Sequence, residues 1–179
     1  TQLGTEARNY LLQVLVNQNL PGFELGLIHS NLLEATDQFS CPIEVGVDNS
    51  NVSQGLFHME RLLEDFIIEN WDETEFGAKY SLIEEEGELK SQQYRTSIGP
   101  IDILAKDKST GDYVVIELKR NQTSDDTVGQ IARYMGWVKE HLNNDSVKGI
   151  IVCGKYDEKL NYAQEMLPNL EVFLYEVRS

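Results

Sequence analysis

Cysteine and long apolar runs are scarce in this chain of 179 residues. Its two cysteines, Cys41 and Cys153, lie far apart and outside any Cys-x-x-Cys pair, which excludes a disulfide framework and a four-cysteine zinc site. No run approaches the ~20 apolar residues of a membrane helix, and no basic segment precedes a hydrophobic stretch as in a signal peptide. We therefore expect a cytoplasmic protein with two reduced, partly buried thiols and no membrane contact.

Positive charge is also scarce. The chain has 15 Lys and Arg against 30 Asp and Glu, a net charge of −15. Such a field slows encounter with a polyanion such as DNA, which argues against a simple nucleic-acid-binding protein. The acids are not evenly spread, because residues 102–148 hold seven basic and eight acidic side chains. A locally positive face on an acidic protein is therefore compatible with the sequence.

Several common kinds of site have no counterpart here. The three histidines, His29, His58 and His141, do not have the spacing of metal ligands. No Ser or Cys lies beside a base in an arrangement typical of a catalytic nucleophile. Gly-rich phosphate loops are absent. These absences exclude a histidine-rich metal centre, a hydrolase with a serine or cysteine nucleophile, and a P-loop enzyme.

The N-terminal third of the chain is the least regular part. Residues 5–20 have the apolar spacing of an amphipathic helix, with Thr5 as a candidate N-cap, and Pro21-Gly22 ends it. Residues 47–55, "VDNSNVSQG", form a polar linker and mark the best internal boundary. We therefore divide the chain into residues 1–55, a helical or irregular segment of unknown role, and residues 56–179, a second domain.

Helix and strand patterns alternate clearly after this boundary. Apolar residues recur at helical spacing over residues 56–70. The pattern then predicts an edge strand within 84–96 after a turn at Gly87, strands at 99–107 and 113–120, a helix at 124–142, a strand at 147–154, a helix at 157–167 and a strand at 171–177. The last strand–helix–strand unit predicts parallel pairing. The fold class is α/β, a mixed sheet flanked by helices.

Charged residues interrupt two of these strands. In "VVIELKR" (114–120), Glu117 and Lys119 follow three β-branched residues and point to one face of the sheet. The preceding strand carries Asp102 between two isoleucines, and a short hairpin loop brings the two strands together. A buried ion pair is one explanation, although desolvation usually cancels its Coulomb gain. Two acids and one lysine leave excess negative charge, which suits a hard divalent cation.

The ordered set of motifs resembles a known family. Asp102 followed by Glu117-Leu118-Lys119 resembles the PD-(D/E)xK nuclease core, and "GPIDILAKDKSTGDYVVIELKR" with "DDTVGQIARYMGWV" resembles the C-terminal domain of NucS/EndoMS-type endonucleases. The resemblance covers about residues 56–177 and leaves residues 1–55 unmatched. The family's Pro-Asp reads Ile101-Asp102 here, with Pro100 one place earlier. The resemblance implies a restriction-endonuclease-like mixed sheet and a metal-dependent DNA endonuclease.

The resemblance also implies roles for individual residues. Asp102 and Glu117 would bind Mg²⁺ or Mn²⁺, and Lys119 would orient or deprotonate the attacking water and stabilise charge on the phosphate. The helix at 56–70 would supply a further acid and metal ligand, for which Glu60 is the first candidate and Glu64 the second. Gln130 would lie beside the active site. Hydrolysis would leave a 3′-hydroxyl and a 5′-phosphate, as in the rest of the superfamily.

The helix at 124–142 carries two stripes. Val128, Ile131, Met135, Val138 and Leu142 are expected to face the sheet, with Gln130, Tyr134, Trp137 and His141 nearly opposite. This placement of Gln130 is in tension with its implied role beside the active site.

Aromatic residues of this second stripe and two arginines are the candidates for contacts with nucleic acid. Tyr134 and Trp137 can stack on bases or sugars, or pack against another part of the protein. Arg120 and Arg133 are candidate phosphate contacts.

Two other classes stay open. The chain can be a catalytically inactive nuclease fold that binds nucleic acid or protein, or the regulatory part of a larger repair or defence protein. The intact set of Asp102, Glu117 and Lys119 favours a true nuclease. A homodimer, or a further domain outside this chain, would then supply most of the DNA affinity.

Overall fold

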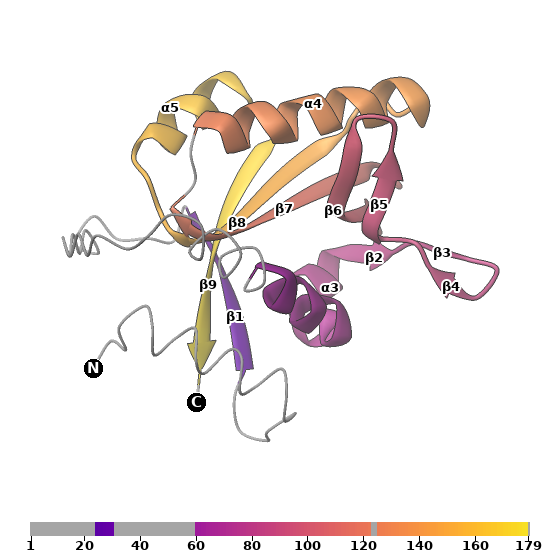
Figure 1. Ribbon diagram of the computed structural model, residues 1–179, viewed down its shortest axis with the longest axis horizontal. Coiled ribbons are helices and arrows are strands. Elements are labelled where there is room, and N and C mark those ends of the chain that lie inside the picture. The colour runs from indigo at the N-terminus through magenta and orange to yellow at the C-terminus, as the bar shows by residue number, and fades with distance from the viewer. Residues whose placement is uncertain (1–23, 31–59, 123–124, 179) are drawn as a thin grey trace, which may run out of the picture.

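The computed structural model describes residues 24–30, 60–122 and 125–178. One seven-stranded mixed sheet dominates this part, with the order β1-β9-β8-β7-β6-β2 and with β5 also paired to β6 (Figure 1). The strands are β1 (Glu24–His29), β2 (Tyr80–Leu82), β5 (Gln92–Thr96), β6 (Gly99–Asp107), β7 (Tyr113–Gln122), β8 (Lys148–Lys155) and β9 (Leu170–Arg178). The short strands β3 (Glu84–Glu85) and β4 (Glu88–Leu89) form a separate hairpin that stands out from the body.

The pairing follows the hairpins and crossovers expected from the sequence. β6 and β7 are antiparallel, whereas β7 and β8, and β8 and β9, are parallel. Helix α4 (Asp125–His141) makes the first crossover, and α5 (Lys159–Met166) makes the second. The predicted helix–strand–helix–strand order of the C-terminal half is therefore confirmed, and its bounds differ from the predicted ones by only one or two residues at most ends.

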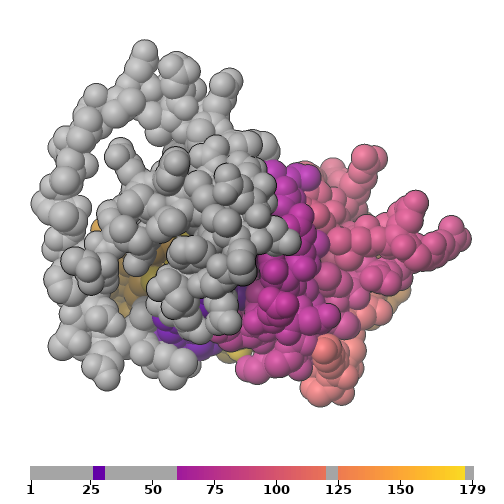
Figure 2. All heavy atoms as spheres, turned by 90° about the horizontal axis from the view of Figure 1, so that it is seen from below, coloured from indigo at the N-terminus to yellow at the C-terminus, as the bar shows by residue number. Residues whose placement is uncertain are grey.

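Helices cover both faces of this sheet. Helices α4 and α5 lie on one face, and the helix over residues 60–69 lies with α3 (Glu75–Lys79) on the other (Figure 1). Seen from below, the segment that begins at residue 60 forms part of this second face (Figure 2). The layers are joined by two buried clusters, because each strand of the central sheet alternates its apolar side chains between the faces. The central strands are apolar on both sides, which is typical of a parallel sheet between helices.

Two strands of the seven-stranded sheet were not expected from the sequence. β1 lies within the segment assigned to a separate N-terminal unit, yet it pairs with β9 along the edge of the sheet. The sheet therefore extends into residues 1–55. β2 is three residues long and pairs with the far end of β6. The predicted helix at 5–20, the linker at 47–55, residues 56–59 of the next helix and the cap at Ser124 lie outside the described residues, as does Cys41. Cys153 is a free, buried thiol, as expected.

The buried stripe of α4 differs from the predicted one. Thr127, Ile131, Tyr134 and Val138 are buried, whereas Met135 is only partly buried. Tyr134, placed by the helical wheel on the outer side, is 6% exposed. The reason is the β5–β6 hairpin, which extends alongside α4: a Cβ on Gly99 would lie 2.8 Å from the Tyr134 hydroxyl. Tyr134 therefore packs under β6, and this burial argues against the predicted stacking on a base.

Gly77 is the tightest backbone approach in the helical layer. A Cβ built there would lie 2.3 Å from the Trp71 carbonyl oxygen and 2.6 Å from the Cα of Asp72, and backbone atoms cannot move aside. We expect Gly77→Ala to lower the free energy of unfolding by about 1–3 kcal/mol, as overpacking usually does. Gly136→Ala is the matched control, since open space surrounds Gly136 on α4. It should be neutral or stabilise by up to about 1 kcal/mol. Equal midpoints for both variants in urea would contradict the packing described.

Candidate active site

The candidate site lies where β6 and β7 part. Their ladder ends at the pair Ile103–Ile116, so Asp102 and Glu117 are the first residues beyond it. Beyond this point the side chain of Asp102, instead of a backbone carbonyl of β6, accepts a hydrogen bond from β7. The backbone N–H of Leu118 donates to Oδ2 of Asp102 over 2.9 Å. A carboxylate that replaces a ladder carbonyl is held firmly against the neighbouring strand. The strands thus place two acids side by side at a fixed point.

Glu117 is buried in a setting that opposes its charge. Its side chain is 1% exposed, and its Oε1 has no hydrogen-bond partner among the described residues. Burial, followed by the negative charge of Asp102 and hydrogen bonding between the two carboxyl groups, raises the pKa of Glu117 to about 9, while Lys119 opposes the shift. Two touching carboxyl groups cannot both ionise without a compensating charge. The pair therefore has the character of a site that a cation completes.

Lys119 lies two residues after Glu117 on β7, and its side chain approaches the helix over residues 60–69. Its Nζ lies 3.9 Å from Oε2 of Glu60, and both side chains are about a quarter exposed, at 26% and 28%. The predicted helix acid Glu60 is thus close to the predicted catalytic lysine. Asp102, Glu117, Lys119 and Glu60 come from two strands and a helix, and the fold brings them to one region of the molecule.

The second candidate acid, Glu64, lies deeper. It is 3% exposed and accepts hydrogen bonds from the side-chain amides of Gln92, over 2.9 Å, and Gln93, over 2.7 Å. Desolvation raises its pKa to about 7, an effect that Asp102 strengthens and that the two amides and Arg61 oppose. The Gln93 amide also lies 3.3 Å from Oδ1 of Asp102, so Glu64 is joined to the site through one residue.

The remaining predicted site residues have different surroundings. Gln130 is half-buried near the start of α4, and the described contacts do not join it to the carboxylates. Arg133 is exposed on the same helix. The side chain of Arg120 lies outside the described residues. Trp137 donates to the Ser97 hydroxyl and stacks on His141 with ring centroids 4.4 Å apart, so its ring is held at the surface by the β5–β6 turn.

Sequence reasoning missed the two glutamines. "SQQYRT" reads as an edge strand in which neighbouring side chains alternate between faces, so only one of the two would be expected to reach the helix. In the structure both reach it, because Gln93 has a φ of 50°. A left-handed residue in a strand leaves no signal in a single sequence when that residue is not Gly, Asn or Asp.

The donor set fits a hard divalent cation. Within the described residues, no three His, Cys, Asp or Glu side chains converge as a closed metal cage. Mg²⁺ does not require one, since it is usually held by one or two carboxylates, with water and substrate oxygens completing the octahedron. The Asp102–Glu117 pair, in which Oε1 of Glu117 has no hydrogen-bond partner among the described residues, has the donor atoms that such a cation would need. Soft or nitrogen-rich sites are a poorer match, because the acids lie together without Cys or His.

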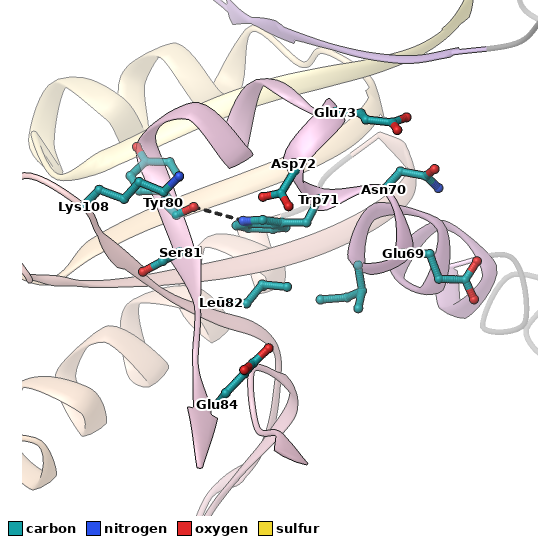
Figure 3. Close-up of a pocket in the computed structure, with 11 residues that line it drawn as sticks. Glu69, Asn70, Trp71, Asp72, Glu73, Tyr80, Ser81, Leu82, Glu84 and Lys108 are labelled. Carbon is teal, nitrogen blue, oxygen red and sulfur yellow. Dashed lines mark hydrogen bonds between the residues drawn. The ribbon is translucent and has the colours of Figure 1, made fainter. Parts of the chain in front are cut away.

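A separate hollow of about 400 Å³ lies at the other end of the same helix (Figure 3). It is lined by Ile68, Glu69, Asn70, Trp71, Asp72, Glu73, Tyr80, Ser81, Leu82, Glu84 and Lys108. Trp71 is fixed there by a 3.0 Å hydrogen bond from its indole nitrogen to the Tyr80 carbonyl. At 1.5 Å per residue, Glu69 is about 13 Å along the helix from Glu60. The acidic side chains that line the hollow would repel phosphate, so we do not assign the catalytic site to this hollow.

The fold and the site together define a restriction-endonuclease-like α/β domain, with carboxylates and a lysine at the point where two central strands separate. Residues 61–173 match the family described as the endonuclease NucS C-terminal domain. The chain belongs to this family. Within the described residues, no helix is both long and apolar enough to cross a membrane.

Individual relatives agree with this placement. The chain is 34% identical to endonuclease NucS of Sulfolobus acidocaldarius over 129 residues, which cover 70% of this chain and 46% of that protein. It is 40% identical to endonuclease NucS of Pseudarthrobacter chlorophenolicus over 131 residues, with the same coverage. The fold is similar to that of a repair endonuclease from Pyrococcus abyssi, with a TM-score of 0.51, 24% identity, and coverage of 72% of this chain and 47% of that one. The chain spans about half the length of the curated relatives it matches.

Proposed function

We propose that this chain is the catalytic part of a metal-dependent DNA endonuclease that acts in DNA repair. The observation that carries the proposal is the pairing of buried Glu117 with half-buried Asp102 where β6 and β7 part, with Oε1 of Glu117 lacking a hydrogen-bond partner among the described residues. A fold of this kind needs no such pair for stability, because an acid buried beside a second acid costs free energy unless something compensates it. Membership of the NucS C-terminal family supports the same conclusion.

The cation would be Mg²⁺ or Mn²⁺, held by Asp102 and Glu117, with Glu60 as a further ligand. When bound, such a cation acidifies a water molecule and offsets charge on a phosphate. The chain's own groups define the rest of the chemistry. Lys119, two residues beyond Glu117 on the strand, would orient the attacking water or take its proton, and would stabilise the developing charge on the phosphate.

The reaction would be hydrolysis of a phosphodiester. The oxygen of water would bond to phosphorus as the bond between phosphorus and the 3′-oxygen breaks, and a proton would pass to that oxygen. The products would be a 3′-hydroxyl and a 5′-phosphate. Gln130 is proposed to lie beside the substrate, near the start of α4, although the described contacts do not join it to the acids.

DNA affinity would come only in part from this chain. Its net charge of −15 opposes encounter with DNA, and the matched segment covers only 46% of each of these two relatives. We therefore propose that a further domain, a second copy of the chain, or both, supply most of the binding. One of the solved structures with a similar fold is described as an EndoMS–dsDNA complex. We also propose that the enzyme is cytoplasmic.

Arg133 is the described residue best placed for a phosphate contact, since it is exposed on α4. We expect Arg133→Ala to weaken DNA binding about equally across sequences and to reduce the slope of log K against log salt by about 1. Lys159→Ala, at an exposed position on α5, is the control and should leave the slope unchanged. Fluorescence anisotropy between about 50 and 200 mM salt measures both. An unchanged slope for Arg133→Ala would remove this residue from the interface.

The proposal is tested by incubating the protein with labelled DNA duplexes, mismatched duplexes, branched DNA and single strands, with Mg²⁺, Mn²⁺ or a chelator. We expect cleavage with either cation, none with the chelator, and 5′-phosphate ends. Asp102→Asn should abolish cleavage without changing the melting temperature by more than a few degrees. Cation-independent cleavage, or full activity in Asp102→Asn, would overturn the assignment. Binding without cleavage of any substrate would favour an inactive nuclease fold.

A further inference from the structure

Gln93 has an unusual backbone for its position. Three non-glycine residues among those described have a positive φ: Glu86, Gln93 and Asn143. Glu86 and Asn143 lie in turns, whereas Gln93 lies inside strand β5 with a φ of 50°. A left-handed residue costs free energy unless its surroundings compensate, and such residues cluster at functional sites. The side chain of Gln93 shows what this conformation achieves.

The conformation directs two consecutive side chains to the same helix. In a regular strand Gln92 and Gln93 would point to opposite faces. Here Gln92 donates to Oε1 of Glu64 over 2.9 Å, and Gln93 donates to Oε2 of the same carboxylate over 2.7 Å. The two amides thus hold both oxygens of one buried acid. Each amide also has a second acceptor: Gln92 donates to Oδ1 of Asp65, on the same helix, whereas Nε2 of Gln93 lies 3.3 Å from Oδ1 of Asp102, on β6.

Asp102 is consequently held at both oxygens. Leu118 N–H fixes Oδ2, and the Gln93 amide fixes Oδ1. An amide nitrogen has two hydrogens, and the two acceptors of Gln93 use both. Each oxygen of Asp102 keeps a lone pair for another partner. The carboxylate is therefore oriented while still able to act as a ligand. Metal-binding carboxylates are commonly oriented in this way by hydrogen bonds from residues that do not themselves bind the metal.

The geometry points to Gln93 as a positioning residue, whose amide orients the Asp102 carboxylate for the catalytic cation by tying it to the buried Glu64. This inference rests on the proposed function, because it concerns how the same site is prepared. Gln93 does not touch the reacting atoms. It sets the angle at which Asp102 faces Glu117, and the left-handed backbone is what brings its amide to that place.

The test compares two neighbouring glutamines. Gln93→Gly removes the amide and suits the left-handed backbone, since glycine adopts positive φ without strain. Gln92→Ala removes hydrogen bonds to the same Glu64 and to Asp65, but none to Asp102. Mn²⁺ binding is measured by calorimetry in the presence of an uncleavable duplex, and the melting temperature of each protein is recorded. Cleavage rates are then measured across a range of Mn²⁺ concentrations.

We expect Gln93→Gly to weaken Mn²⁺ binding about 10- to 100-fold, the usual effect of losing an outer partner, and to shift the half-saturating Mn²⁺ concentration by the same factor. The rate at saturating Mn²⁺ should stay within a few-fold of wild type, because the bound cation then orients Asp102. Gln92→Ala should change Mn²⁺ affinity less than about twofold while lowering the melting temperature, and Gln93→Gly should lower it less.

The outcomes separate this inference from the proposed function. Wild-type cleavage with unchanged Mn²⁺ affinity in Gln93→Gly would overturn the inference and leave the nuclease assignment intact. Equal weakening in both variants would show that Gln93 acts only by holding the helix, which also overturns it. A wild-type protein that neither binds Mn²⁺ nor cuts DNA would remove the proposed function, and the inference with it.

Discussion

Replacing Lys119 by Ala is expected to lower the rate of DNA cleavage by about 10²- to 10⁴-fold, the usual contribution of a positioned proton-transfer or charge-stabilising group. Lys119 follows Glu117 on β7 by two residues, and its Nζ lies 3.9 Å from Glu60. Its side chain is only partly buried, so truncation should leave the melting temperature almost unchanged. The rate is measured on the best substrate with saturating Mg²⁺.

Two further variants sharpen this result. Lys106→Ala removes a lysine at the far end of β6, where its ammonium lies over the Tyr113 ring, and should cleave as wild type does. Lys119→Arg keeps the positive charge but cannot give up its proton near neutral pH. Substantial activity in Lys119→Arg would show that charge suffices, and a loss as large as that of Lys119→Ala would indicate proton transfer. A loss below tenfold in Lys119→Ala would contradict the assignment of this residue.

Replacing Glu117 by Gln is expected to abolish cleavage and yet to stabilise the metal-free protein at pH 8 by about 2–4 kcal/mol. The folded-state pKa of Glu117, about 9, lies above the ordinary value of 4.5, because burial and Asp102 disfavour its charge. The folded state therefore holds this proton more tightly than the unfolded state. The associated stability is complete below about pH 4.5 and is lost as the pH rises through about 9. Glutamine is neutral throughout and its amide can donate to Asp102.

The pH profile distinguishes Glu117 from Glu64. In the presence of a chelator, the free energy of unfolding of the wild-type protein should fall between about pH 5 and pH 9. In Glu117→Gln the fall should be confined to the range up to about pH 7, where Glu64 titrates. Urea denaturation at intervals of one pH unit measures both profiles. Glu140→Gln, at an exposed position on α4, is the control and should follow the wild type. If the free energy of unfolding of Glu117→Gln fell up to pH 9 in the same way as that of the wild type, the result would contradict the burial of Glu117.

Much of the sheet could be predicted because its signals are local. β6 spans Gly99–Asp107, the predicted range, since an apolar run is followed directly by a short Gly-containing loop. The same hairpin sets Asp102 beside Glu117. The trio of Asp102, Glu117 and Lys119 was thus accessible from strand periodicity and hairpin length alone. The parallel pairing of β8 and β9 followed from the last strand–helix–strand unit.

The parts that could not be predicted depend on contacts between distant segments. β1 and β9 pair although they lie near opposite ends of the sequence, and no local pattern in either segment predicts that the two will pair. Tyr134 is buried because the β5–β6 hairpin extends over α4, which a helical wheel cannot show. The reach of Gln93 to Asp102 depends on a backbone angle that only the packed structure stabilises. In each case tertiary packing overrides the local pattern.

The most direct test of the account is a calorimetric titration of Mn²⁺ into the wild-type protein and into Asp102→Asn, each with an uncleavable duplex present. The account predicts a bound cation in the wild-type protein and an affinity at least about 10-fold weaker in Asp102→Asn, because one of the two carboxylate ligands is lost. Equal binding in both proteins would place the cation elsewhere, and no binding in either would contradict a metal site at the parting of β6 and β7.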